Sequence, residues 1–305
     1  MTLGVLFSAL EFGLIYALIA LSLFISFTIL NICDLSTDGC YMLGAAVGVS
    51  FTIMGHPLLA ILAAMLAGVA SGFVCAILQT KLGVPSILAG IVVNTGLYTV
   101  NLCVMGLKTQ LNLVNKDTVF SLFGGISESA FWQKSYKLIL LIIIVALVGT
   151  LIYLFLGTGL GLSIRATGDS PAMVRASSID PSFTITVGLM ISGSLTGLAG
   201  CLAGQYSRTA EINMGTGMVT IALASLIIGS TIFGRGKMPV KIFGAVMGSV
   251  IYRIIIAIAL RLRVPTQAFK LVSAIIVAVA IAAPKVSEIY AMNKRKKAAM
   301  ARRGK

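Results

Sequence analysis

Long apolar runs constrain the fold of this chain more than any other feature of its 305 residues. A helix that crosses a membrane needs about 20 mostly apolar residues, and runs of about this length recur from one end of the chain to the other. We therefore expect an all-α fold, a polytopic bundle of eight or nine membrane helices. The candidate spans are 3–30, 41–54, 58–80, 85–107, 138–156, 183–205, 218–233, 240–260 and 268–283.

The composition agrees with a membrane protein and leaves little material for catalysis. Hydrophobic residues make up 58% of the chain and charged residues 10%, whereas about a quarter of a soluble domain is charged. There are nine acidic residues and one histidine, His56. We expect no catalytic residue, no metal site and no cofactor in this chain. The five cysteines form no CxxC pair and are interpreted as packing residues.

A polar break separates the first two apolar runs. It extends from Asn31 to Gly39, and the run that follows it, 41–54, is too short to cross a membrane alone. Backbone groups freed by such a break cannot face lipid, because nothing there would pair with them. We predict a broken helix near residues 31–39, with a surface loop as the alternative. If 41–54 does not cross, eight spans remain and the N-terminus lies inside; nine spans would place it outside.

Basic residues suggest how the chain is oriented. The segment 285–305 has eight basic residues and one acidic residue, and a basic flank after an apolar helix is typical of the cytoplasmic side. Nucleic-acid binding is the disfavoured alternative, and we expect lipid contact but no nucleic-acid partner. The predicted organisation is one transmembrane domain over 1–284, with an outer segment at 108–137, a cytoplasmic segment at 157–182, and a cytoplasmic tail.

The cytoplasmic segment predicts a short helix. Ser170 followed by Pro171 is typical of an N-cap and a first helical position, and Pro181 prevents the helix from continuing. This helix would display Met173 and Val174 in the cytosol. A loop facing lipid headgroups would explain nearby arginines, but not a capped helix that displays apolar residues.

Two halves of the chain echo each other weakly. Each has an apolar run, a polar break and a run rich in small residues, the breaks being 31–39 and 205–217. Corresponding breaks are typical of transporters built from inverted repeats. The glycine-rich run 229–235 resembles a phosphate loop, but Arg235 stands where lysine is required, so we assign it no nucleotide.

The segment from Arg165 to Pro181, with Ser-Ser-Ile-Asp-Pro at its end, resembles permease subunits of bacterial ABC importers. The resemblance is to the branched-chain amino acid and monosaccharide type, and it covers roughly the whole chain. The break Asp-Leu-Ser-Thr-Asp-Gly, from Asp34 to Gly39, is similar to the element after the first core helix of these permeases. Its second acid looks most like the branch linked to tryptophan and tyrosine uptake.

This resemblance implies a subunit of the bacterial cytoplasmic (inner) membrane that forms the path for a small polar solute. An amino acid is favoured, aromatic first and branched-chain next. A cytosolic ABC ATPase would bind ATP and Mg, an extracellular solute-binding protein would deliver the solute, and a second copy would complete a homodimer. The implied coupling helix contacts the ATPase through Arg165, Thr167, Gly168, Asp169, Ser170, Met173, Val174 and Arg175.

Polar residues at membrane depth are costly, which makes them candidates for the translocation path or its gate. Alternatives stay open for several of them. Asn94 could bond a neighbouring helix, and Glu211 could lie in an outer loop that receives the binding protein. The two acids of the break could cap the helix expected near Tyr41, Asp38 being the nearer. The candidates are Asp34, Ser36, Asp38, Asn94, Thr95, Gln205, Glu211 and Asn213.

Rival functions are an ion-coupled secondary transporter, in which Glu11, Asp34 and Asp38 would be the buried carboxylates, and an ABC permease for a sugar or nucleoside. A channel would need a repeated pore motif, which the sequence lacks. A component of an exporter is a further alternative, because only the resemblance to importers indicates the direction of transport.

Overall fold

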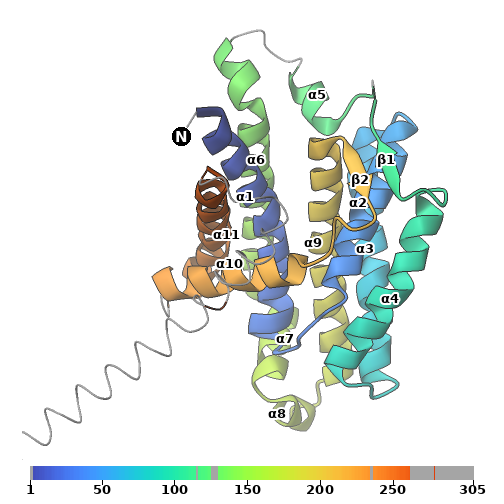
Figure 1. Ribbon diagram of the computed structural model, residues 1–305. Helices are drawn as coiled ribbons and strands as arrows, with labels where there is room; N and C mark the ends of the chain where they lie inside the picture. Colours follow the sequence, from blue (N-terminus) through green and yellow to red (C-terminus); the bar gives the residue numbers. More distant parts are fainter. Residues whose placement is uncertain (1–2, 115, 125–129, 234–235, 262–277, 279–305) are drawn as a thin grey trace, which may run out of the picture.

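The chain folds into a bundle of helices with one two-stranded ribbon at one end (Figure 1). The computed structural model describes residues 3–114, 116–124, 130–233, 236–261 and 278. The all-α prediction is confirmed, with two three-residue strands added. The elements are α1 (Leu3–Leu23), η1 (Phe24–Ile29, a π-helix), α2 (Thr37–Ile53), α3 (Pro57–Thr80), α4 (Ser86–Val104), β1 (Gln110–Asn112), α5 (Val119–Gly124), α6 (Ala130–Leu156), α7 (Gly159–Asp169), α8 (Pro171–Ala176), α9 (Pro181–Ser207), β2 (Thr209–Glu211), α10 (Met218–Phe233) and α11 (Met238–Arg261).

Six helices in the described part of the chain are long and apolar enough to cross a membrane. They are α1 continued by η1, α3, α4, α6, α9 and α11. α2 and α10 are shorter, with 17 and 16 residues. The predicted total of eight or nine spans remains a prediction, because the last expected span, 268–283, lies outside the described residues except at position 278. Leucines and isoleucines stand exposed along α3, α4 and α6, as lipid-facing helices require.

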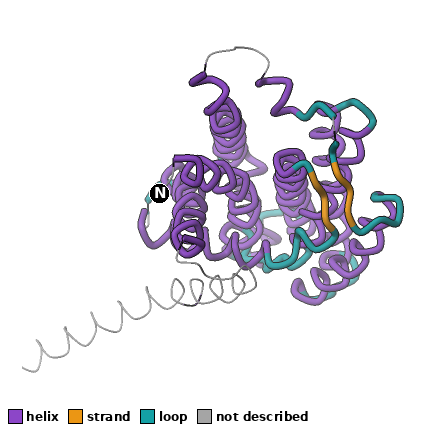
Figure 2. Tube along the Cα trace, turned by 45° about the horizontal axis from the view of Figure 1, so that its top comes forward, coloured by secondary structure: helices purple, strands orange, loops and turns teal. Residues whose placement is uncertain are grey.

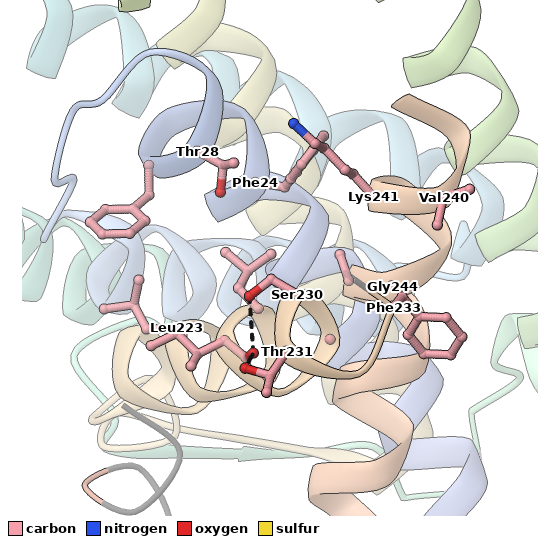
Figure 3. A pocket seen from close by; sticks show the side chains of 14 residues that line it. Phe24, Thr28, Leu223, Ser230, Thr231, Phe233, Val240, Lys241 and Gly244 are labelled. Atoms are coloured by element: carbon pink, nitrogen blue, oxygen red, sulfur yellow. Dashed lines mark hydrogen bonds between the residues drawn. The ribbon is translucent and has the colours of Figure 1, made fainter. Parts of the chain in front are cut away.

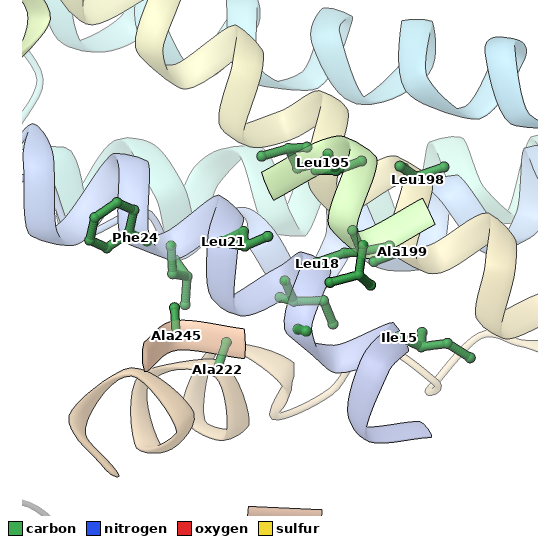
Figure 4. Packing of buried hydrophobic residues seen from close by; sticks show 14 of the residues in the cluster. Ile15, Leu18, Leu21, Phe24, Leu195, Leu198, Ala199, Ala222 and Ala245 are labelled. Atoms are coloured by element: carbon green, nitrogen blue, oxygen red, sulfur yellow. The ribbon is translucent and has the colours of Figure 1, made fainter. Parts of the chain in front are cut away.

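α9 lies at the centre of the bundle and packs closely against α2 and α3. A methyl group on Gly44 of α2 would collide with the carbonyl oxygen of Gly197, and one on Gly68 of α3 with that of Gly193. Small residues let helix backbones approach in this way, which replaces the hydrophobic driving force that is missing in lipid. On the other side of α9, apolar side chains of α1, α10 and α11 form the main core (Figure 4).

α2 begins halfway through the bundle. The Cys40 thiol, in the first turn of α2, donates to the carbonyl oxygen of Gly193 at 3.4 Å, and Gly193 lies halfway along the 27-residue α9. Gly44 and Gly48 then face Gly197 and Cys201, so the two helices run in parallel. The predicted interruption is therefore present, but the helix resumes at Thr37 and not near Tyr41. Leu30 to Ser36 is the non-helical part.

The second half contains a corresponding interruption. α9 ends at Ser207, and β2 pairs antiparallel with β1, with Gln110 opposite Glu211 (Figure 2). The chain then returns into the bundle through residues 212–217, and α10 starts beside the first turn of α2. α10 runs across the bundle in the view of Figure 1. Both halves thus have a helix that begins inside the bundle after a polar break, as the sequence echo predicts.

Candidate translocation path and coupling surface

Asp34 and Ser36 build the turn that leads into α2. Asp34 is 4% exposed, and its Oδ1 accepts hydrogen bonds from the Ser36 amide at 2.9 Å and the Ser36 hydroxyl at 2.6 Å. The Thr37 hydroxyl donates to the Asp34 carbonyl oxygen at 3.0 Å. Asp and Ser form turns of this kind because their short side chains bond the nearby backbone. Asp34 thus shapes the turn before α2, whereas the N-cap position of α2 is Ser36, where no side chain makes a capping bond.

Asp38 caps a different helix from the one expected. It lies in the first turn of α2, but its Oδ2 accepts from the Gly217 amide and its Oδ1 from the Val219 amide, both at 2.9 Å. These amides belong to the N-terminus of α10, where free N–H groups and the helix dipole favour an acid. The prediction that Asp38 caps its own helix is wrong. Gly215 lies so close to the Asp38 carbonyl oxygen that α10 begins directly beside this carboxylate.

A polar cavity of about 280 Å³ lies where α2, α4 and the segment 212–216 meet. It contains four of the predicted path residues, namely Asp38, Asn94, Thr95 and Asn213. Three other polar residues of its lining were not predicted from the sequence. Two of these, Tyr98 and Asn101, follow Asn94 at helical spacing, which could have identified them. The lining residues are Asp38, Gly39, Met42, Asn94, Thr95, Tyr98, Asn101, Ile212, Asn213, Gly215 and Thr216.

The remaining path candidates lie elsewhere. Gln205 is buried; its Nε2 donates to the Pro57 carbonyl oxygen at 3.2 Å, and its Oε1 accepts from the Val119 amide at 2.9 Å. It therefore ties α9 to the starts of α3 and α5. Glu211 is exposed in β2, in the ribbon. Neither residue, nor Asp34 or Ser36, lines the polar cavity.

A second cavity, of about 390 Å³, lies between η1, α10 and α11 (Figure 3). Most of its lining is apolar, including Phe24, Leu223 and Phe233. The hydroxyls of Ser230 and Thr231 donate to the Ile227 carbonyl oxygen at 3.0 and 2.7 Å, within α10 itself. None of the sequence-predicted site residues lines this cavity. Residues 229–233 of the glycine-rich run form the last part of α10.

At the end of the bundle opposite the ribbon, α7 and α8 carry the predicted coupling residues. Ser170 caps α8 as predicted, with its Oγ accepting from the Met173 amide at 3.4 Å, and Pro171 is the first helical residue. The helix ends at Ala176, and Pro181 starts α9. α7 was not predicted; it contains the coupling residues up to Asp169.

The predicted coupling residues divide into an exposed set and a buried set. Met173 is 60% exposed, and Arg165, Asp169 and Arg175 are exposed beside it. The prediction that Val174 is displayed is wrong, because this side chain is 2% exposed; it points inward from the short α8. Thr167 is also buried, and its hydroxyl pairs with that of Thr184 at 2.7 Å.

Gly168 joins α7 to the break after η1. A methyl group on Gly168 would collide with the carbonyl oxygen of Ile29, and the Asn31 side-chain amide donates to the Gly168 carbonyl oxygen at 3.2 Å. Asn31 itself has a φ of 56°, in the left-handed region that Asn tolerates better than most residues. The exposed α7–α8 surface is thus in direct contact with the segment that leads to α2.

Comparison with known proteins gives the family. Residues 5–281 match the family model described as the branched-chain amino acid transport system permease component. The tyrosine transport system permease protein of Clostridioides difficile (strain R20291) is 33% identical over 267 residues, which covers 87% of this chain and 86% of that protein.

Two sugar permeases match over shorter regions. The D-allose transport system permease protein AlsC of Escherichia coli (strain K12) is 40% identical over 36% of this chain and 33% of its own length. The fructose import permease protein FruF of Bifidobacterium longum (strain NCC 2705) is 30% identical over 52% of this chain and 44% of its own length. No solved structure matches the chain.

Because the family model spans almost the whole chain and six described helices can cross a membrane, the chain is a multi-pass inner-membrane protein that belongs to the branched-chain amino acid transport system permease family.

Proposed function

We propose that this chain forms the translocation path of an ATP-driven importer for an amino acid, with aromatic amino acids first and branched-chain amino acids next. The observation that carries the proposal is the match to a tyrosine transport system permease over 87% of the chain. The polar cavity halfway through the bundle supports it, because a polar solute needs polar groups at membrane depth.

The α7–α8 surface is the proposed docking site for a cytosolic ATPase, which binds ATP and Mg. An apolar side chain, Met173, protrudes there beside the guanidinium groups of Arg165 and Arg175. An apolar contact surrounded by polar and basic groups is the usual composition of a protein interface. The ribbon at the other end faces the solute-binding protein in this proposal.

The contacts suggest how movement at the ATPase reaches the path. Displacement of α8 moves α7, and Gly168 presses on Ile29 and Asn31 at the break. The break continues through the Asp34 turn into α2, and Asp38 links α2 to α10. Closure of the ATPases then shifts the two half-depth helices relative to each other, a rigid-body change that alternates access to the path.

A second copy of the chain completes the path in this proposal. α4 forms one wall of the polar cavity, and its Thr95 and Tyr98 are exposed in a single copy. A homodimer that buried the face of α4 would enclose this cavity.

Sugar import is the second candidate, because the allose and fructose permeases match parts of the chain. Uptake by proteoliposomes that contain the permease, its ATPase and its solute-binding protein decides between the two. We expect ATP-dependent accumulation of labelled tyrosine that unlabelled tryptophan reduces and D-allose does not. Accumulation of D-allose without accumulation of any amino acid would refute the amino acid assignment.

A further inference from the structure

The polar cavity between α2, α4 and residues 212–216 has a carboxylate and three amide side chains in its lining, whereas the cavity between η1, α10 and α11 has hydroxyls and Lys241 among apolar residues. A cavity beside α3, α6 and α9 has one hydroxyl residue, Ser194, in its lining, and the rest of the lining is apolar. The polar cavity combines a carboxylate, amides, hydroxyls and an aromatic ring. Its volume of about 280 Å³ is near the lower limit of small-molecule sites, which suits a solute of the size of an amino acid.

Asn101 provides an acceptor without a donor. It lines the cavity from α4 and is 2% exposed. Its Nδ2 donates to the Gly39 carbonyl oxygen at 3.2 Å, which fixes the orientation of the amide. Its Oδ1 is buried and accepts no hydrogen bond within the described chain. Buried polar atoms are rarely left unpaired, and an unpaired one at a cavity suggests a ligand that donates.

A carboxylate stands next to this acceptor. Asp38 precedes Gly39, the residue that holds the Asn101 amide, and both residues line the cavity. The Asp38 carboxylate accepts the Gly217 and Val219 amides at 2.9 Å and also interacts with the Met218 amide. A carboxylate has about four acceptor positions, so three backbone amides leave room for a further donor. In the part of the chain that the structure describes, no basic side chain pairs with this carboxylate. A carboxylate and an amide oxygen together favour a cationic group with several N–H donors over a neutral hydroxyl.

Apolar surface completes the lining. Tyr98 lies one helical turn from Thr95 on α4 and half of its side chain is exposed, while Met42 of α2 is buried against the cavity. An aromatic ring and a thioether are good contacts for an aromatic or large aliphatic side chain. The cavity therefore offers acceptors for a cation and a surface for an apolar group.

We propose that this cavity is a transient binding subsite for an amino acid in transit. The α-ammonium group donates to the Asp38 carboxylate and to Asn101 Oδ1, and the amino acid side chain packs against Tyr98 and Met42. This inference rests on the proposed amino acid transport, and it assigns recognition to the permease itself in addition to the solute-binding protein.

Ligand competition on the full-length permease in nanodiscs, without partner proteins, tests the subsite. The probe is radiolabelled L-tyrosine, and the competitors are tyramine, which keeps the ammonium group, and 3-(4-hydroxyphenyl)propionate, which lacks it. We expect saturable tyrosine binding, competition by tyramine, and at least tenfold weaker competition by the propionate. Asn101→Ala should weaken tyrosine binding at least tenfold, whereas the control Asn112→Ala, in β1, should leave it unchanged.

Three results would overturn the subsite. The first is equal competition by tyramine and the propionate, and this comparison needs no variant, so it holds if Asn101→Ala fails to fold. The second is wild-type tyrosine binding by a folded Asn101→Ala protein. The third is absence of saturable tyrosine binding to a permease that transports tyrosine within the complete transporter. The last result would leave the proposed function intact, whereas a complete transporter that accumulates no amino acid would refute the proposed function itself.

Discussion

At the scale of single residues, Asp38 connects the two halves of the molecule. Its carboxylate accepts hydrogen bonds from Gly217 and Val219, residues more than 170 positions away in the sequence. This single side chain holds the start of α10 against the start of α2. Both helices begin inside the bundle beside the polar cavity, so this contact stabilises the junction on which the cavity depends.

Replacing Asp38 by alanine should destabilise the protein. The substitution leaves two amides at the N-terminus of α10 without their acceptor, and the loss of an N-terminal cap costs about 1 to 2 kcal/mol. Thermal unfolding in detergent measures this change. Asp117→Ala is the control, because Asp117 is exposed and accepts a bond from Ser121 at 3.3 Å. Equal stability of the two variants would contradict the linking role of Asp38.

The sequence predicted the residues of this junction better than their roles. Asp34 and Asp38 both precede an apolar helix, so capping could be inferred for either acid. The helix that Asp38 caps could not be inferred, because it depends on how residues 212–217 fold back into the bundle. The same fold-back brings Asn213 to Asn94 and Thr95, whereas Gln205 and Glu211 stay near the ribbon end.

At the scale of elements, small residues determine how closely α2, α3 and α9 pack. A methyl group on Gly44 would collide with the Gly197 carbonyl oxygen, whereas one on Gly96 of α4 would meet no atom within 4 Å. Gly44→Ala should therefore destabilise the bundle by about 1 to 3 kcal/mol through overpacking. Gly96→Ala should be neutral or stabilising, because alanine has the higher helix propensity. Thermal unfolding of both variants checks this, and similar effects of the two substitutions would refute close packing at Gly44.

The exposed face of α8 gives a prediction about the partner ATPase. Met173→Asp places a charge on the proposed docking surface, and a desolvated charge in an apolar groove is costly. We expect at least tenfold weaker recovery of the ATPase in detergent pull-downs, with normal amounts of folded permease. Met54→Asp is the matched control, an exposed methionine between α2 and α3 at the ribbon end. Wild-type ATPase recovery by Met173→Asp would show that α8 is not the docking element.

Helices could be predicted from the sequence where a single local pattern determines them. Apolar runs predicted the long helices, and Ser170 with Pro171 predicted the start of α8. The sequence did not reveal α7, since its run Gly159–Asp169 contains several glycines and polar residues that read as a loop. It also misplaced Val174, because helical spacing does not tell which side of a short helix meets the rest of the bundle.

At the scale of the whole molecule, three regions with proposed roles lie along the bundle. The α7–α8 surface occupies one end, the β1–β2 ribbon occupies the other, and the polar cavity lies between them at the junction of the two interrupted helices. The contact between Gly168 and Ile29 connects the α7–α8 surface to the non-helical segment that leads into α2. This arrangement suits a subunit that takes a solute from one partner and its energy from another.

The most direct test of this account separates ATP from ion gradients as the driving force. Proteoliposomes that contain the permease and its ATPase are given the solute-binding protein on one side and ATP with Mg on the ATPase side. We predict tyrosine accumulation that requires ATP and both partners, and no accumulation by the permease alone under a proton or sodium gradient. Accumulation driven by a gradient without the ATPase would contradict the account and identify an ion-coupled transporter.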